Sequence, residues 1–323
     1  MVQTPVLFIT FVRPDYARQT WDGIKAAQPK KLYFYSNKGR ADKEGEVNCN
    51  NEIRAYINEI DWECDLHTLF RDECVNVYDS LRGAIDWLFD NEERGIILEE
   101  DCVPTKAFFS FVDQMLDKFE YEDRVWCISG DNYVDESLIE DDYYFSHYHY
   151  MYGWATWASR WERIDWQAPW VKKEFTKTQF KNLYKTRDQV SFRVKELRGL
   201  VDFINRTKCW DYLFGYTMDC NNALTVHPKY HLVTNIGLSG THHESGKISK
   251  INKLANPVFD EYTIEQSPAD IVPNYDVDYL IYKMFQYASF PQKVKSSLQY
   301  RVPLYFGKIM RVFKKLYRSR LHR

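Results

Sequence analysis

The sequence predicts an α/β fold in which a mixed, mostly parallel sheet is flanked by helices. Strand-like apolar runs alternate with helical patterns through the first 130 residues. A helical segment follows the opening strand at once, and parallel strands require such a crossover. The composition, with 45% hydrophobic and 28% charged residues, is that of a folded globular protein. Together these observations indicate a doubly wound sheet.

The alternating elements can be assigned in order along the chain. The run PVLFITF (5–11) has strand length and no charged residue, as expected of a strand buried on both faces. Residues 15–28 place Trp21 and Ile24 at helical spacing, and KLYFYS (31–36) supplies the next strand. The later elements are expected at 75–92 (helix), 95–98 (strand), 107–119 (helix), 124–130 (strand), 222–228 (strand) and 230–237 (strand).

The pattern changes after residue 130. Segment 143–161 is aromatic and poor in aliphatic residues, so we expect it to form a wall of a binding site. Segment 171–208 is polar, lysine-rich and helical in pattern, as in an insertion that covers one side of the sheet. We expect one domain over residues 1–245 and a helical C-terminal extension over residues 246–323.

The charge and the cysteine content exclude some classes of protein. A formal net charge of -3 argues against nucleic-acid binding. Seven cysteines, an odd number without regular spacing, fit reduced thiols better than a disulfide framework. The opening MVQTPVLFIT lacks the basic segment of a signal peptide and the apolar length of a membrane span. We therefore expect a cytoplasmic location.

Three adjacent acids, Glu99, Glu100 and Asp101, follow the apolar run GIIL at the expected end of a strand. Ligands of open α/β sheets bind outside the carboxyl ends of the strands. Carboxylates without histidine or cysteine favour Mg²⁺ or Mn²⁺, which usually takes one or two carboxylates together with substrate phosphates. In an extended chain Glu99 and Asp101 share a face and Glu100 faces away, which makes Asp101 the expected direct ligand. Alternatively, the acids only solvate the end of the strand.

Six segments carry a resemblance to a known family through their order: PVLFITFVRP, ILEEDCVPTKAFFSF, VWCISGDN, YGWATWASRW, CWDY and NIGLSGTHH. In this order the chain resembles nucleotide-sugar glycosyltransferases of the GT-A fold over residues 4–243. It is most similar in type to N-acetylglucosaminyltransferases that act on α-mannosides and to their bacterial homologues. The resemblance implies a Rossmann-like sheet and transfer of a sugar from a nucleoside-diphosphate donor, expected to be a UDP-sugar.

The resemblance implies how the donor is bound. The family triplet is usually Glu-Asp-Asp and binds the donor diphosphate through Mn²⁺, whereas Glu100 takes the middle place here. Ser36 and Asn37 stand where the family usually has an aspartate that holds the base or ribose. Arg13 is placed near the nucleotide, and Arg82 is a further candidate for a phosphate contact, because a guanidinium group suits both ligands. Either arginine can instead be a surface residue.

Asp211, in CWDY, matches the segment that supplies the catalytic base in the family. An inverting transferase needs such a carboxylate to deprotonate the attacking hydroxyl. The family often has two adjacent aspartates here, and Tyr212 takes the second place in this chain. Two alternatives remain open: Asp211 is only a helix N-cap, or Asp131 in SGDN is the base.

Two further segments are implied to touch the donor. Gly153 and Trp154 resemble the loop that lines the donor sugar, where a glycine permits close approach and an indole can stack on the sugar. His242 and His243 fall in the family's C-terminal loop, where one histidine can contact the metal or the diphosphate. We assign His242 to the metal and His243 to the donor without a strong preference between them.

The last residues form a basic, amphipathic pattern. Residues 303–323 hold no acid, and apolar residues fall on one helical face between lysines and arginines. Such a helix can lie on an anionic membrane, on the inner face of the cytoplasmic membrane if the protein is cytoplasmic, or can pack on the rest of the chain. We therefore expect a metal-dependent, inverting glycosyltransferase with a glycan or lipid-linked acceptor, in bacterial surface polysaccharide synthesis. The alternative is a non-catalytic nucleotide-sugar or carbohydrate-binding protein.

Overall fold

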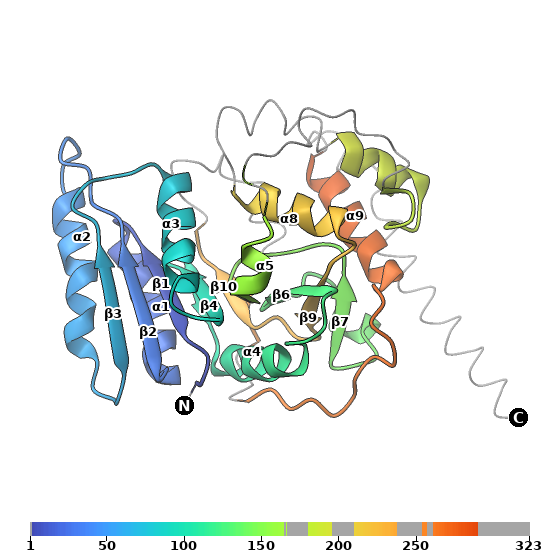
Figure 1. The fold of residues 1–323 in the computed structure, drawn as a ribbon, viewed down its shortest axis with the longest axis horizontal. Helices are drawn as coiled ribbons and strands as arrows, with labels where there is room; N and C mark the ends of the chain where they lie inside the picture. Colours follow the sequence, from blue (N-terminus) through green and yellow to red (C-terminus); the bar gives the residue numbers. More distant parts are fainter. Residues whose placement is uncertain are drawn as a thin grey trace, which may run out of the picture.

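The computed structural model describes residues 2–164, 166, 180–195, 210–237, 254–256 and 261–289 (Figure 1). Its central feature is an eight-stranded sheet with the strand order β3-β2-β1-β4-β8-β6-β9-β7. The strands are β1 (Val6–Thr10), β2 (Lys31–Ser36), β3 (Asp65–Phe70), β4 (Arg94–Glu99), β6 (Val125–Ser129), β7 (Tyr143–Ser146), β8 (Trp154–Trp157) and β9 (Leu224–Pro228). Strands β1 to β4 are mutually parallel, as are β6 and β9. Strands β7 and β8 run against their neighbours, so the predicted mixed, mostly parallel sheet is confirmed.

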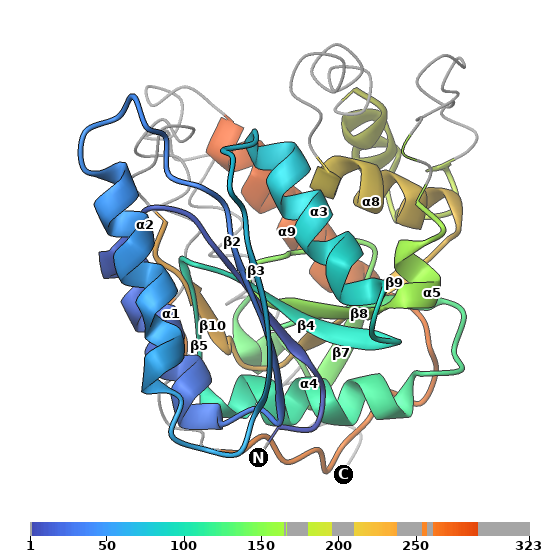
Figure 2. The ribbon, with the colours of Figure 1, turned by 60° about the vertical axis from the view of Figure 1, so that its left-hand side comes forward.

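Helices cover both faces of this sheet. They are α1 (Pro14–Ala27), α2 (Glu46–Arg54), α3 (Val77–Phe89), α4 (Lys106–Lys118), α5 (Ala158–Trp161), α8 (Trp210–Cys220) and α9 (Tyr275–Ser289), with 3₁₀ turns η1 (Ala55–Glu59) and η2 (Glu136–Leu138). In the view of Figure 2, α4 lies below the strands and α3 and α8 lie above them. Strand β1 shows the alternation that builds both cores, because Phe8 packs with α1 and α4 while Leu7 and Ile9 pack with α3 and α8.

Local signals fix the starts of the helices that lie next to the acids. Pro14 occupies the first turn of α1, where its missing N–H costs nothing. Asn76 caps α3 by accepting from the Asp79 N–H at 3.1 Å, and Thr105 caps α4 by accepting from the Phe108 N–H at 3.2 Å. The helices that flank the acidic strand end thus begin at defined residues.

Some elements differ from the sequence prediction. Helix α2 and strand β3 occupy a stretch for which no element was predicted, because α2 buries only Asn50 and Ile53 and lacks a continuous apolar face. The predicted strand 230–237 is shorter, and as β10 (Val233–Asn235) it pairs with β5 (Cys102–Pro104) in a separate two-stranded sheet. Strand β8, within the expected site wall, lies inside the main sheet between β4 and β6.

The segment that contains α9 packs on the edge of the sheet. Asp278 is buried and accepts from the Ser146 hydroxyl at 2.5 Å and from the His147 backbone N–H at 3.2 Å. Pro273 forms a β-bridge with Phe145. Within the predicted insertion, residues 187–195 are helical. Residues 171–179 and 196–208 of this insertion lie outside the described residues. The predicted basic helix at 303–323 also lies outside them.

In the described part of the chain, no helix combines the length and the apolar character needed to cross a membrane.

Candidate functional site

The predicted acids lie where several strands end together. Strands β1, β2 and β4 are parallel, so their carboxyl ends share one edge of the sheet, and β8 begins at the same edge because it runs antiparallel to β4. The chain after β1 leads to Arg13, and β4 leads into Glu100 and Asp101. The start of α8 brings Asp211 to this edge, where its charge acts on Glu99.

Arg13 joins two of the three acids. Its Nε donates to Glu100 Oε1 at 2.5 Å, and its Nη2 donates to Asp101 Oδ2 at 2.8 Å. Glu100 also accepts from the Phe11 backbone N–H at 2.6 Å. The Glu100 side chain is only 5% exposed, so the arginine supplies the opposite charge that a buried carboxylate needs. Arg13 was assigned to the nucleotide, and here it holds the acids together.

The third acid lies in a negative environment. Burial, together with the charges of Asp101 and Asp211, raises the pKa of Glu99 to about 8. Burial also raises the pKa of Asp211. The charges of Asp101 and Asp211 therefore act on Glu99 from the end of β4 and from α8, and the charge of Arg13 offsets only part of their effect. A cation bound at this position would relieve the repulsion.

The donor set suits a hard divalent cation. Asp101 already binds one cationic group, the Arg13 guanidinium, through Oδ2. The chain after β10 passes tightly over this carboxylate: Ile236 N donates to the Asp101 carbonyl at 2.8 Å, and a Cβ added at Gly237 would lie 2.1 Å from Asp101 Oδ2. Among the described residues, no three His, Cys, Asp or Glu side chains form a metal cluster by themselves. Mg²⁺ or Mn²⁺ commonly binds through one or two carboxylates with substrate phosphates, and Asp101 with Glu99 fits that pattern.

Asp211 lies in the first turn of α8. Its contacts are compatible with both roles left open by the sequence, the catalytic base and the helix cap. Its carboxyl group accepts from its own backbone N–H and from that of Tyr212, as a carboxylate at a helix start does. Its charge also reaches Glu99. The other candidate, Asp131, is fully buried and accepts from the Tyr133 hydroxyl at 3.2 Å and from the Tyr152 N–H at 3.3 Å. Asp131 thus binds together the loop after β6 and the segment before β8.

Gly153 fixes the backbone conformation of the predicted loop before β8. Gly153 has a φ of +84°, and a Cβ there would lie 2.7 Å from a Val233 methyl group. Its carbonyl accepts from the Gly130 N–H at 2.9 Å, which joins the loop to the end of β6. Trp154, assigned to the donor sugar, is only 1% exposed, and its ring stacks on Trp210 with centroids 5.6 Å apart. The indole therefore supports the residue that precedes Asp211.

The side chains of Ser36 and Asn37, which were predicted to contact the nucleoside, form hydrogen bonds within the protein. Ser36 Oγ accepts from Asn50 Nδ2 at 3.0 Å and from Arg54 Nε at 3.1 Å. Asn37 is buried, donates to the Val75 carbonyl at 2.9 Å, and accepts from the Val75 N–H at 3.2 Å. These bonds fix the loop after β2, and the backbone of Asn37 is also bonded within the protein, its N–H to Thr10 and its carbonyl to Asn50.

The remaining predicted residues are not joined to the acids by the described contacts. Arg82 on α3 forms an ion pair with Asp86 at 3.3 Å, and its guanidinium group lies 4.3 Å from the centre of the Trp166 ring. His242 and His243 lie outside the described residues. Gly237, the last described residue before them in the sequence, lies beside Asp101.

Sequence reasoning missed two residues that adjoin the site. The pKa of the Tyr152 phenol is raised by burial and by the charges of Asp131, Cys102, Glu99 and Asp211, so its hydroxyl feels the charge of the acids. His149 contacts the start of α8, where the backbone of Asp211 hydrogen-bonds its ring. Both belong to the aromatic segment expected to form a site wall, but no spacing rule singles them out among its many tyrosines and histidines.

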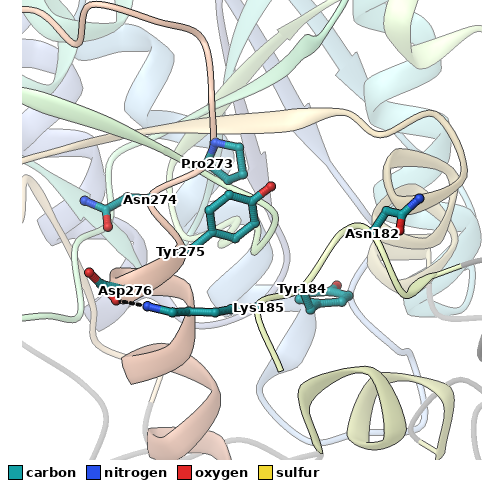
Figure 3. Close-up of a pocket in the computed structure, with 7 residues that line it drawn as sticks. All are labelled: Asn182, Tyr184, Lys185, Pro273, Asn274, Tyr275 and Asp276. Carbon is teal, nitrogen blue, oxygen red and sulfur yellow. Dashed lines mark hydrogen bonds and ion pairs between the residues drawn. The ribbon is translucent and has the colours of Figure 1, made fainter. Parts of the chain in front are cut away.

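A pocket lies apart from the acids (Figure 3). It has a volume of about 530 Å³ and is lined by Asn182, Tyr184, Lys185, Pro273, Asn274, Tyr275 and Asp276. Lys185 and Asp276 form an ion pair across it, and Tyr275 is 39% exposed. None of the predicted site residues lines this pocket, so it is distinct from the acidic edge of the sheet.

The comparisons with known proteins found structural similarity alone. No family model and no curated protein matches the sequence. A mannosyltransferase from Pyrobaculum calidifontis, solved with GDP-Man and Mn²⁺, superposes with a TM-score of 0.36 at 13% identity over 51% of this chain and 47% of that chain. This chain thus matches about half the length of that enzyme.

Two nucleotidyltransferases superpose to a similar extent. A UDP-glucose pyrophosphorylase complexed with UDP-glucose has a TM-score of 0.30 at 9% identity over 51% of this chain and 79% of that chain. The 4-diphosphocytidyl-2C-methyl-D-erythritol synthase from Anaerococcus prevotii has a TM-score of 0.35 at 10% identity over 74% of this chain and 94% of that chain. The α/β class of the present fold is defined by its own sheet and helices.

Proposed function

We propose that this protein is a divalent-metal-dependent, inverting glycosyltransferase that moves a sugar from a nucleoside-diphosphate donor to a hydroxyl group. The observation that carries the proposal is the convergence of Glu99, Asp101 and Asp211 at the edge where the parallel strands end. Ligands of open α/β sheets bind at this edge. The end of β4 would therefore supply the carboxylates that bind the cation, and α8 would supply the base.

Each side chain has a definable part in such a transfer. Asp101 and Glu99 would hold the cation and through it the donor diphosphate, and the bound metal would neutralise charge on the departing nucleotide. Asp211 would take the proton of the attacking hydroxyl. Burial raises its pKa, so it is a stronger base than an exposed aspartate. The Tyr152 phenol, whose pKa is raised in part by the charges of Glu99 and Asp211, would donate a hydrogen bond to a sugar or to the leaving group.

Thermal denaturation with nucleotides tests the donor proposal. We expect UDP to raise the melting temperature only in the presence of Mn²⁺ or Mg²⁺, because a ligand that binds the native state alone stabilises it. At a UDP concentration about 100 times its Kd, the gain should be about 2.7 kcal/mol. GDP, CDP and ADP serve as parallel ligands, and a chelator serves as the control for the metal.

The outcome also separates the two functional alternatives. Metal-dependent stabilisation followed by release of free nucleotide from a UDP-sugar supports the transferase. Tight donor binding without release of nucleotide, over a panel of acceptors, favours a non-catalytic nucleotide-sugar or carbohydrate-binding protein. Stabilisation by no nucleotide at all contradicts the transferase and favours a protein that binds carbohydrate alone.

We further propose that the acceptor is a glycan or a lipid-linked glycan presented at a membrane surface in polysaccharide synthesis. This proposal depends on the basic segment 303–323, which holds Lys308, Arg311, Lys314, Lys315, Arg318, Arg320 and Arg323. The full chain should bind vesicles containing phosphatidylglycerol at low salt, since each cation near an anionic surface contributes about 1 kcal/mol.

The control for this prediction is a chain that ends before Pro303. It should bind the same vesicles much more weakly, and neutral phosphatidylcholine vesicles should bind neither form. Equal binding of both chains to the anionic vesicles would show that the basic segment has no part in membrane association. Flotation of the vesicles in a density gradient measures the bound fraction directly.

A further inference from the structure

The ring of His149 fits into a gap in helix α8 that only a glycine can leave. A Cβ added at Gly215 would lie 1.8 Å from His149 Cε1 and 2.2 Å from Nε2. No real Cβ makes contacts this short, so any other residue at 215 would displace the ring. Gly215 stands four residues after Asp211, hence one turn along the same face of the helix.

At this position the ring reaches the backbone of Asp211. The hydrogen bond between them favours the protonated ring, as donation from the ring to a carbonyl oxygen does. Burial and the nearby charge of Arg193 outweigh this bond and lower the pKa of His149 to about 3, so the ring is neutral at physiological pH. A neutral imidazole has a single N–H donor, and this donor is committed to Asp211. The buried Nδ1 has no hydrogen-bond partner among the described residues.

A glycine in a helix interior requires a reason, because it destabilises the helix relative to alanine. Here the reason is the ring of His149. The residue of α8 that bonds the ring is Asp211, whose charge also acts on Glu99.

We propose that His149 is a positioning residue that fixes the first turn of α8, and with it the carboxyl group of Asp211, and that Gly215 is required to admit the histidine ring. The inference rests on the proposed function, since it concerns the group assigned as base. His149 lies in the aromatic segment before β8, so this segment would also position Asp211, in addition to any contact with the donor.

Kinetics of the full-length enzyme test the proposal. His149→Phe keeps a planar ring but removes the donor, and we expect kcat to fall about 10- to 100-fold, as small displacements of catalytic groups do. The KM for the donor and the Mn²⁺-dependent stabilisation by UDP should stay unchanged, because Asp101 is not affected. His149→Gln, whose amide can replace the N–H donor, should recover most of the lost kcat. The matched control is His147→Asn, because His147 is buried two residues away and bonds Asp278 rather than Asp211.

The glycine provides an independent test. Gly215→Ala should lower kcat because its methyl group displaces the ring, and the double variant His149→Ala/Gly215→Ala should match His149→Ala alone, since both changes act on one contact. Amide hydrogen exchange in the first turn of α8 should be faster in His149→Phe than in the wild type, and this readout needs no activity. Unchanged kcat and unchanged exchange in His149→Phe would overturn the proposal, whereas altered exchange in a protein without transferase activity would overturn only the proposed function.

Discussion

Replacing Asp211 by asparagine should reduce sugar transfer by about 10²- to 10⁴-fold, the contribution typical of a general base. The asparagine keeps the size and the polarity of the side chain and can still accept from the first-turn N–H groups of α8. It cannot take a proton from the acceptor. The donor should bind as before, so UDP with Mn²⁺ should stabilise the variant as it does the wild type. Release of nucleotide from the donor, with and without acceptor, measures the effect.

A carboxylate at another helix start provides the control. Asp79 lies in the first turn of α3 and is exposed, and Asp79→Asn should leave transfer unchanged. The wild-type rate should also decline as the pH falls, and at a higher pH than an ordinary aspartate would require, because the pKa of Asp211 is raised and only the deprotonated form is a base. An Asp211→Asn enzyme with normal turnover would leave Asp211 as a helix cap alone.

Replacing Asp101 by asparagine should abolish the stabilisation by UDP that depends on Mn²⁺, a loss of about 2.7 kcal/mol at a UDP concentration 100 times the Kd. The reason is chemical: Asp101 is the carboxylate that already binds a cationic group through Oδ2, and an amide is a weaker ligand for a hard cation. Transfer should fall with it. Calorimetric titration of the protein with Mn²⁺ in the presence of UDP provides a second measurement.

An acid that follows another parallel strand is the matched control. Asp72 comes after β3 and is exposed, so Asp72→Asn should leave metal and nucleotide binding intact. The metal-free Asp101→Asn chain should melt close to the wild type, which would show that the variant is folded. If UDP and Mn²⁺ still stabilise this variant fully, the cation is held elsewhere and the donor site must be reassigned.

The sheet could be predicted because its strands are buried on both faces. Continuous apolar runs such as VLFIT and GIIL have few alternatives once helical patterns separate them. Strand β8 was harder to predict. Its sequence WATW (154–157) is aromatic and follows a tyrosine-rich segment, a pattern that fits the wall of a ligand site equally well. Only its pairing with β4 and β6 shows that it belongs to the sheet.

The candidate site could be predicted by residue type but not by contact. The sequence placed the acids at a strand end, yet alternation predicted that Glu100 would face away from Asp101. Both acids share Arg13 because β4 ends at Glu99 and the extended geometry does not continue. The approach of Asp211 to Glu99 joins positions more than a hundred residues apart, and it depends on how α8 packs. No local pattern contains that information.

Arg13 bridges Glu100 and Asp101, and this bridge bears on how the proposed transferase would release its products. An acidic site without an internal counter-charge would need a bound cation before the chain could fold. Proteins of that kind unfold when their metal ions are chelated. Here the guanidinium group provides an internal counter-charge. In the proposed transferase, nucleotide and ion could therefore depart together after each round, because Glu100 and Asp101 would keep the Arg13 counter-charge until the next donor arrives.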